Sequence, residues 1–158
     1  YGKRRSAPFH ALSGHVEKLG YNWLHIQINT LLPHCRYQPP VWLSDTIRRL
    51  LDDFEARGNS IPYFREQAML VIDEHSAVDG RRVFDQDNKG WKAVCNALKG
   101  RVIPDDDQYT LAISLLAAQS AENICHITLM DLRDASDFFA MRSGDDSFGC
   151  IYGHPGLI

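Results

Sequence analysis

This chain of 158 residues lacks the marks of several common protein classes. Its four cysteines include no Cys-x-x-Cys pair, which disfavours a zinc ribbon and a disulfide framework and indicates reduced thiols. No apolar run approaches the length that crosses a bilayer, and no signal peptide, repeat or low-complexity tract is recognisable. With 44% hydrophobic and 23% charged residues, the composition predicts one globular domain in the cytoplasm, without a membrane segment.

A basic excess is missing as well. The net charge is −3, with 17 basic and 20 acidic side chains, whereas proteins that bind nucleic acids usually carry a positive surface. Five of the acidic residues, however, lie in two short groups, at 85–87 and 105–107. If these five bind a metal ion, 15 acidic residues remain against 17 basic ones, so the composition still permits a nucleic-acid partner.

Apolar residues alternate along the chain between the spacing of strands and that of helices. Leu43, Ile47, Leu50, Leu51 and Phe54 follow helical spacing, and Gly58 is a plausible end for that helix. The predicted strands cover 21–32, 67–74, 111–115 and 125–129, and the predicted helices cover 43–54, 89–99 and 134–140. The last two strands suit an antiparallel hairpin joined through 119–123.

This pattern predicts an α+β fold. We expect a single two-layer domain with a mixed or antiparallel sheet, helices on one face and the element order β-α-β-α-β-β. The domain would cover 21–142, between an N-terminal basic extension at 1–20 and an irregular tail at 143–158.

The greatest concentration of chemistry surrounds the predicted helix at 89–99. Asp85, Asp87 and Asn88 precede this helix, and Asp105, Asp106 and Asp107 follow it. Because the helix spans roughly 16 Å, the two groups meet only if the chain doubles back. Clustered carboxylates raise one another's pKa or recruit a cation, and Mg²⁺, with Mn²⁺ as a possible substitute, suits such oxygen donors.

Basic residues accompany these carboxylates. Arg81 and Arg82 lead into Asp85, and helical spacing places Lys89, Lys92 and Lys99 on one face of the predicted helix. These five cations are the candidate contacts to a DNA backbone. A solvated amphipathic face is the alternative reading.

The order of these residues carries a family resemblance. The segment reads Arg81-Arg82-Val83-Phe84-Asp85-Gln86-Asp87-Asn88, then Lys92, then Ala97-Leu98, then Asp105-Asp106-Asp107-Gln108. This pattern resembles the RusA-like Holliday-junction resolvases, which show a basic lead-in, D-x-D-N, a helix lysine, an A-L pair and D-D-x-Q before a strand. The resemblance covers about residues 21–131.

The resemblance implies a homodimeric, Mg²⁺-dependent endonuclease that nicks two strands of a four-way DNA junction symmetrically, in DNA recombination and repair. By position it implies that Asp85, Asp87 and Asp106 are catalytic metal ligands and that Lys92 is the catalytic lysine. Lys92 follows Asp87 by one residue more than in the family pattern, and Asp105 or Asp107 could replace Asp106 as a ligand. Two metal ions held by shared aspartates would supply what phosphodiester hydrolysis requires.

Other interpretations remain open at this point. Asp87 and Asn88 could cap the helix, and 105–107 could be an acidic turn that enters a strand. Asp73, Glu74 and His75 are more simply solvated strand-end residues than extra ligands, and the scattered Cys and His residues form no strong zinc pattern. Besides the nuclease, the chain could be a catalytically silent DNA-binding protein on the same fold, or a phosphohydrolase of a small substrate.

Overall fold

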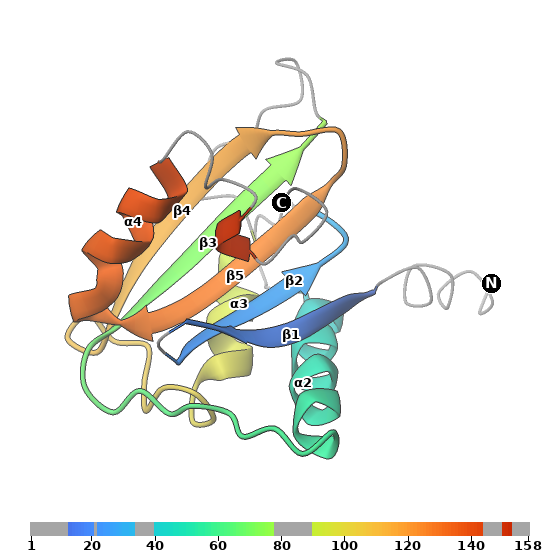
Figure 1. The fold of residues 1–158 in the computed structure, drawn as a ribbon. Helices are drawn as coiled ribbons and strands as arrows, with labels where there is room; N and C mark the ends of the chain where they lie inside the picture. The colour runs from blue at the N-terminus through green and yellow to red at the C-terminus, as the bar shows by residue number, and fades with distance from the viewer. Residues whose placement is uncertain (1–12, 21, 34–39, 78–89, 144–149, 153–158) are drawn as a thin grey trace, which may run out of the picture.

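A five-stranded mixed sheet forms the centre of the computed structural model, which describes residues 13–20, 22–33, 40–77, 90–143 and 150–152 (Figure 1). The strand order across the sheet is β1-β2-β5-β3-β4, and only β3 and β4 run parallel to each other. The strands are β1 (Gly14–Leu19), β2 (Trp23–Ile28), β3 (Ala68–Ser76), β4 (Leu111–Gln119) and β5 (Ile124–Asp131). The predicted α+β class and single mixed sheet are confirmed.

The predicted hairpin of the last two strands is wrong. β4 and β5 do not pair with each other, because β3 lies between them. Burial gives the reason: β5 is buried on both faces over six consecutive residues, as a central strand must be, whereas β4 is largely half-buried, as is typical of an edge strand. The chain therefore passes from β3 through α3 (Trp91–Leu98) into the parallel strand β4.

Helices cover both faces of the sheet. α2 (Val41–Ala56) and α3 pack on one face, where the larger apolar core includes Leu70 and Ile127. α4 (Ala135–Ser143) and the 3₁₀ turn η5 (Cys150–Tyr152) contribute Phe138 and Tyr152 to a smaller core that contains Val71, from the opposite side of β3 (Figure 1). A short 3₁₀ turn, η4 (Leu132–Asp134), leads from β5 into α4. The expectation that all helices share one face fails for α4.

The helix α2 matches its sequence pattern. Its five predicted apolar positions are buried, and Gly58 follows the helix with a φ of +92°, a conformation in which glycine avoids the strain of a side chain. None of the helices in the described part of the chain is long and apolar enough to span a membrane.

The N-terminal part of the sheet begins earlier than the predicted domain boundary at residue 21. β1 pairs antiparallel with β2, from Gly14 opposite Ile28 to Leu19 opposite Trp23. The turn between them uses Gly20 and Asn22, both at positive φ, which suits a tight hairpin. The basic extension at 1–20 therefore contains a strand, and the element order gains β1 before β2 and α4 after β5.

Candidate functional site

The structure describes only part of the predicted acidic site. Asp85, Asp87, Arg81, Arg82 and Lys89 lie outside the residues that the structure describes, as does Asn88. The described part comprises α3 and the segment that follows it, with Lys92, Lys99 and the three aspartates at 105–107.

After α3 the chain turns back sharply. The amide of Arg101 donates to the carbonyl of Leu98, and Gly100, at a φ of +81°, donates to the carbonyl of Ile103. This turn returns Asp105 and Asp106 to Lys99, whose Nζ lies 3.3 Å and 3.6 Å from their respective Oδ1 atoms. The downstream carboxylates thus lie beside Lys99, the residue that follows α3. The other acidic group, at 85–87, lies outside the described residues, so the meeting of the two groups stays a prediction.

Asp106 also acts on the middle of α3. Burial raises the pKa of the Cys95 thiol to about 12, and the charge of Asp106 adds to this shift. Cys95 lies one helical turn after Trp91, the first residue of α3. Asp106 therefore lies close enough to the middle of α3 for its charge to act on Cys95.

The three consecutive aspartates have different surroundings. Oδ1 of Asp107 accepts hydrogen bonds from the amides of Tyr109 and Thr110, at 2.8 Å and 3.0 Å, and from the Thr110 hydroxyl. Asp105 accepts the amide of Asp106 at 2.8 Å, and this bond, together with Lys99, lowers its pKa. For Asp107 the turn interpretation is confirmed, so the carboxylates better suited to a metal ion are Asp105 and Asp106.

The two described lysines of the predicted basic face differ. The ammonium of Lys99 is the counter-charge of Asp105 and Asp106, and these partners raise its pKa. Lys92 is exposed, and its Nζ lies 6.0 Å from the centre of the Trp91 ring. Of the two, Lys92 is the one placed to meet an external anion.

A second set of residues approaches the start of α3. Gly90 lies against Pro33, where a Cβ atom would come within 3.2 Å of the proline ring. The buried carboxylate of Glu74, near the end of β3, accepts the amide of Leu32 at 2.6 Å. The end of β3 and the start of α3 are thus both fixed to the segment that follows β2.

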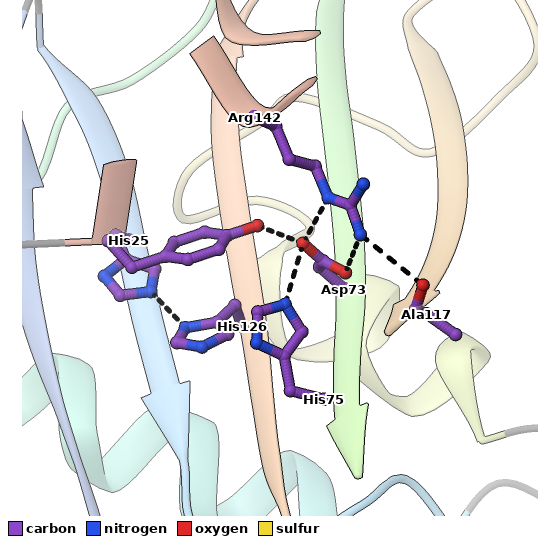
Figure 2. A network of polar contacts seen from close by, with 7 residues as sticks. His25, Asp73, His75, Ala117, His126 and Arg142 are labelled. Atoms are coloured by element: carbon purple, nitrogen blue, oxygen red, sulfur yellow. Dashed lines mark hydrogen bonds and ion pairs between the residues drawn. The ribbon is translucent and has the colours of Figure 1, made fainter. Parts of the chain in front are cut away.

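Asp73, Glu74 and His75 are all buried, so the expectation of solvated strand-end residues was wrong. Asp73 and His75 project from the face of β3 opposite to Glu74, toward α4 and η5. There Arg142 donates two hydrogen bonds to Asp73, from Nε to Oδ2 at 2.7 Å and from Nη2 to Oδ1 at 2.9 Å (Figure 2). The Tyr152 hydroxyl donates to the same carboxylate, and His75 Nε2 lies 3.3 Å from Oδ2.

Two further histidines extend this polar cluster across the sheet. His25 Nδ1 lies 2.9 Å from Oε2 of Glu17. His25 Nε2 lies 2.9 Å from Nδ1 of His126 (Figure 2). The Tyr152 ring stacks on His126 at a centroid distance of 3.8 Å and an angle of 7°. We call the set Glu17, His25, Asp73, His75, His126, Arg142 and Tyr152 the histidine cluster.

The charges of the histidine cluster follow from its contacts. Burial raises the pKa of Asp73, but hydrogen bonds from His75, Arg142 and Tyr152 outweigh it and hold that pKa well below its usual range. Burial, together with the charge of Asp73, raises the pKa of Tyr152 well above its usual range. The cluster therefore holds an ionised carboxylate beside a neutral phenol.

The sequence carried a signal for this cluster. Asp73 and His75 are two residues apart in one strand, and His126 and Thr128 are two apart in another, so each pair shares one face. Polar residues at period 2 ordinarily indicate a face in contact with water. The cover that buries them comes from α4 and η5, which lie later in the chain.

The described parts of these two regions contain no preformed metal site. Within the residues that the structure describes, no group of three or more histidine, cysteine, aspartate or glutamate side chains is placed to hold a metal ion. Cys125 and His126 are adjacent in sequence but project to opposite faces of β5, so they cannot share a zinc ion. No family model and no curated protein matches this chain.

Proposed function

We propose that this protein is a Mg²⁺-dependent, structure-selective endodeoxyribonuclease that resolves four-way DNA junctions by paired symmetric nicks, in DNA recombination and repair in the cytoplasm. The order of motif residues from Arg81 to Gln108, similar to that of RusA-like resolvases, suggests the activity. The observation that supports it most directly is the return of Asp105 and Asp106 to α3, beside Lys99.

The donor set is suitable for a hard divalent cation. Asp105 and Asp106 offer carboxylate oxygens, their side chains are 48% and 33% exposed, and two adjacent negative charges favour a cation between them. Lys99 supplies that positive charge in the structure. Asp85, Asp87 and Asp106 would hold Mg²⁺, or Mn²⁺ in its place, with Asp105 as a further ligand. The bound ion would supply Lewis-acid activation of a phosphodiester and of the attacking water.

The basic residues would bind and orient the DNA. Lys92, exposed on the first turn of α3, would hold the scissile phosphate and stabilise its charge. Arg81, Arg82 and Lys89 would contact the neighbouring phosphates. When the cation binds, it would replace Lys99 as the counter-charge of Asp106, and Lys99 would then contact the DNA backbone. Two symmetric nicks require two sites related by a two-fold axis, so we propose a homodimer.

A cleavage assay tests this proposal. The protein is incubated with a labelled four-way junction, with linear duplex of the same sequence and with a generic phosphodiester, each in Mg²⁺, Mn²⁺ or EDTA. Asp106→Asn is expected to reduce metal-dependent junction cleavage by at least about 100-fold, while junction binding in EDTA stays unchanged. Asp107→Asn is the matched control and is expected to cleave, because Asp107 is engaged in a turn.

The same assay separates the alternatives. Undiminished cleavage by Asp106→Asn would exclude Asp106 as a metal ligand. Undiminished cleavage by Asp87→Asn would contradict the assignment of the D-x-D-N motif as the catalytic metal site. Junction binding without cleavage at any metal concentration would indicate a silent DNA-binding protein. Turnover of the small ester alone would indicate a phosphohydrolase.

A further inference from the structure

The strand β4 is an edge strand without the usual protection of an edge. It is the last described strand on its side of the sheet, and its pairing with β3 runs without a bulge from Leu111 to Gln119 (Figure 1). Its nine residues, LAISLLAAQ, include no charged residue and no proline. The other edge strand, β1, has six residues and carries Glu17 and Lys18. Natural sheets usually shorten, charge or bend an open edge, because such an edge can pair with another chain.

Two hydrogen bonds identify the backbone groups of β4 that face β3. The amide of Ala68 donates to the carbonyl of Thr110 at one end of the pairing, and the amide of Ser120 donates to the carbonyl of Ser76 at the other. In a parallel pair, alternate residues of a strand direct both their N–H and their C=O to the partner strand. The even-numbered residues of β4 therefore bond to β3, and the odd-numbered residues direct their backbone groups to the open edge.

Two of these outward groups already have partners within the chain. The amide of Leu111 donates to the carbonyl of Asp107 at 3.0 Å, and the carbonyl of Ala117 accepts from Nη2 of Arg142 at 3.5 Å. Among the described residues, none bonds to the outward groups that lie between these two. They are the carbonyl of Leu111, the amides and carbonyls of Ile113 and Leu115, and the amide of Ala117.

This set of outward groups is complementary to itself. In an antiparallel pair, two opposite residues can each donate to the carbonyl of the other. A two-fold axis at Ser114 would place Ile113 of one copy opposite Leu115 of the other, with both bonds formed. The amide of Ala117 would then donate to the carbonyl of Leu111. The groups that this arrangement leaves over, the amide of Leu111 and the carbonyl of Ala117, are the two that are already bonded.

The side chains of β4 suit the same partner. Ile113 and Leu115 pack against the larger apolar core and Leu116 packs against the smaller one, yet all three are only half-buried. A second strand beside them would cover apolar surface on both faces of the sheet. An unrelated strand could use the same hydrogen bonds, but the match of donors and acceptors about one axis favours a second copy of this chain.

We propose that β4 pairs antiparallel with β4 of a second copy about a two-fold axis at Ser114, so that two five-stranded sheets become one continuous sheet. This interface would belong to the homodimer of the proposed nuclease and in that sense rests on the proposed function. The two Leu111 residues would lie about 20 Å apart along the strands, since each begins β4 three residues before the axis. The acidic segments at 105–107 would then lie near opposite ends of the paired strands, related by the symmetry that two symmetric nicks require.

Light scattering after size-exclusion chromatography tests the pairing. At about 1 to 100 μM, the unsubstituted protein is expected to reach twice the 17.9 kDa of a single chain. Ala117→Pro replaces an exposed side chain, removes an amide that β3 does not use and places the proline ring at the edge. It is expected to raise the dissociation constant of the dimer at least about tenfold. Ala117→Ser keeps the amide, and this matched control is expected to remain dimeric.

Hydrogen exchange of single amides, followed by NMR, gives a second measurement. In the unsubstituted protein the outward amides of Ile113 and Leu115 are expected to be protected, as are the inward amides of Ala112 and Ser114. In Ala117→Pro, the outward amides are expected to lose at least about tenfold in protection, while the inward amides keep theirs. If Ala117→Pro fails to fold, the unsubstituted protein alone decides, because protection limited to the inward amides would overturn the pairing.

The mass measurement also separates this interface from the nuclease. The mass of a single chain for the unsubstituted protein, or equal dissociation constants for the two Ala117 variants, would overturn the pairing. A protein that is dimeric through β4 but cleaves no DNA would reject the proposed nuclease and keep the interface. A protein that cleaves four-way junctions as a single chain would reject the interface and keep the nuclease.

Discussion

Arg142 and Asp73 join α4 to the centre of the sheet through two parallel hydrogen bonds. They are 69 residues apart in sequence, and their side chains are 17% and 0% exposed. Nη2 of the same guanidinium also lies 3.5 Å from the carbonyl of Ala117 on β4, so Arg142 connects three elements (Figure 2). The two-point geometry matches the planar fork of arginine, which lysine cannot reproduce.

We expect Arg142→Gln to lower the free energy of unfolding by about 3 kcal/mol, because it leaves the buried carboxylate of Asp73 without its counter-charge. The control is Arg133→Gln, since Arg133 is 82% exposed and its contact with Asp131 is 3.4 Å long. An exposed pair of this kind contributes at most about 1 kcal/mol. Urea unfolding followed by circular dichroism gives both values, and equal losses in the two variants would contradict the importance of the buried pair.

A second prediction separates the roles of the consecutive aspartates. Asp107→Ala removes the acceptor of two backbone amides and one hydroxyl, and we expect it to lower the free energy of unfolding by about 1 to 2 kcal/mol. Asp105→Ala removes an exposed contact with Lys99 and the acceptor of one exposed backbone amide, and we expect a smaller loss than in Asp107→Ala, at most about 1 kcal/mol. The reverse order of effects in a thermal or urea unfolding experiment would show that the turn depends on Asp105.

The alkaline limit of stability is the subject of a third prediction. Cys95 and Tyr152 both have raised pKa values in the folded protein, about 12 for Cys95, so the unfolded chain loses these protons at lower pH than the folded protein. Their contribution is complete below about pH 8.5 and declines as the pH rises above it. We expect the free energy of unfolding to fall between pH 9 and pH 11, and to fall less steeply in Cys95→Ala. The same slope in both proteins would contradict the shift at Cys95.

The sequence was sufficient to predict the elements whose apolar pattern is complete within one segment of the chain. The helix α2 shows five apolar residues at helical spacing, all of them buried, and β3 shows a continuous apolar run of a central strand. The pairing of β4 with β3 was not visible, because it depends on α3 returning the chain parallel to β3 and on β5 entering between β2 and β3. Such an arrangement follows from tertiary packing and leaves little trace in the period of either strand.

The candidate site shows the same division between local and distant causes. The turn at Asp107 was predictable, since an aspartate ahead of a strand commonly accepts amides of its own turn. The burial of His25, Asp73 and His126 was not, because these strands would face water without α4 and η5. Hydrogen bonds reconcile their polar character with their burial: His25 and His126 bond to each other, and Asp73 accepts from Arg142.

A final prediction tests the strand that the sequence pattern missed. Gly14 begins β1, and a Cβ atom at this position would lie 2.1 Å from the carbonyl oxygen of Gln27 on β2 and 3.1 Å from Cδ1 of Leu50. Backbone cannot yield as a flexible side chain does, so Gly14→Ala must separate the start of β1 from β2. We expect a loss of about 1 to 3 kcal/mol in the free energy of unfolding.

The matched control for Gly14→Ala is His15→Ala. His15 is the next residue of β1, its side chain is 47% exposed, and we expect its replacement to change stability by less than about 0.5 kcal/mol. Hydrogen exchange at the amides of β2 gives a second measurement, because only Gly14→Ala is expected to raise exchange next to Gln27. A Gly14→Ala variant with an unchanged midpoint and unchanged exchange would show that residues 14–19 are not paired with β2, and the boundary of the domain would return to residue 21.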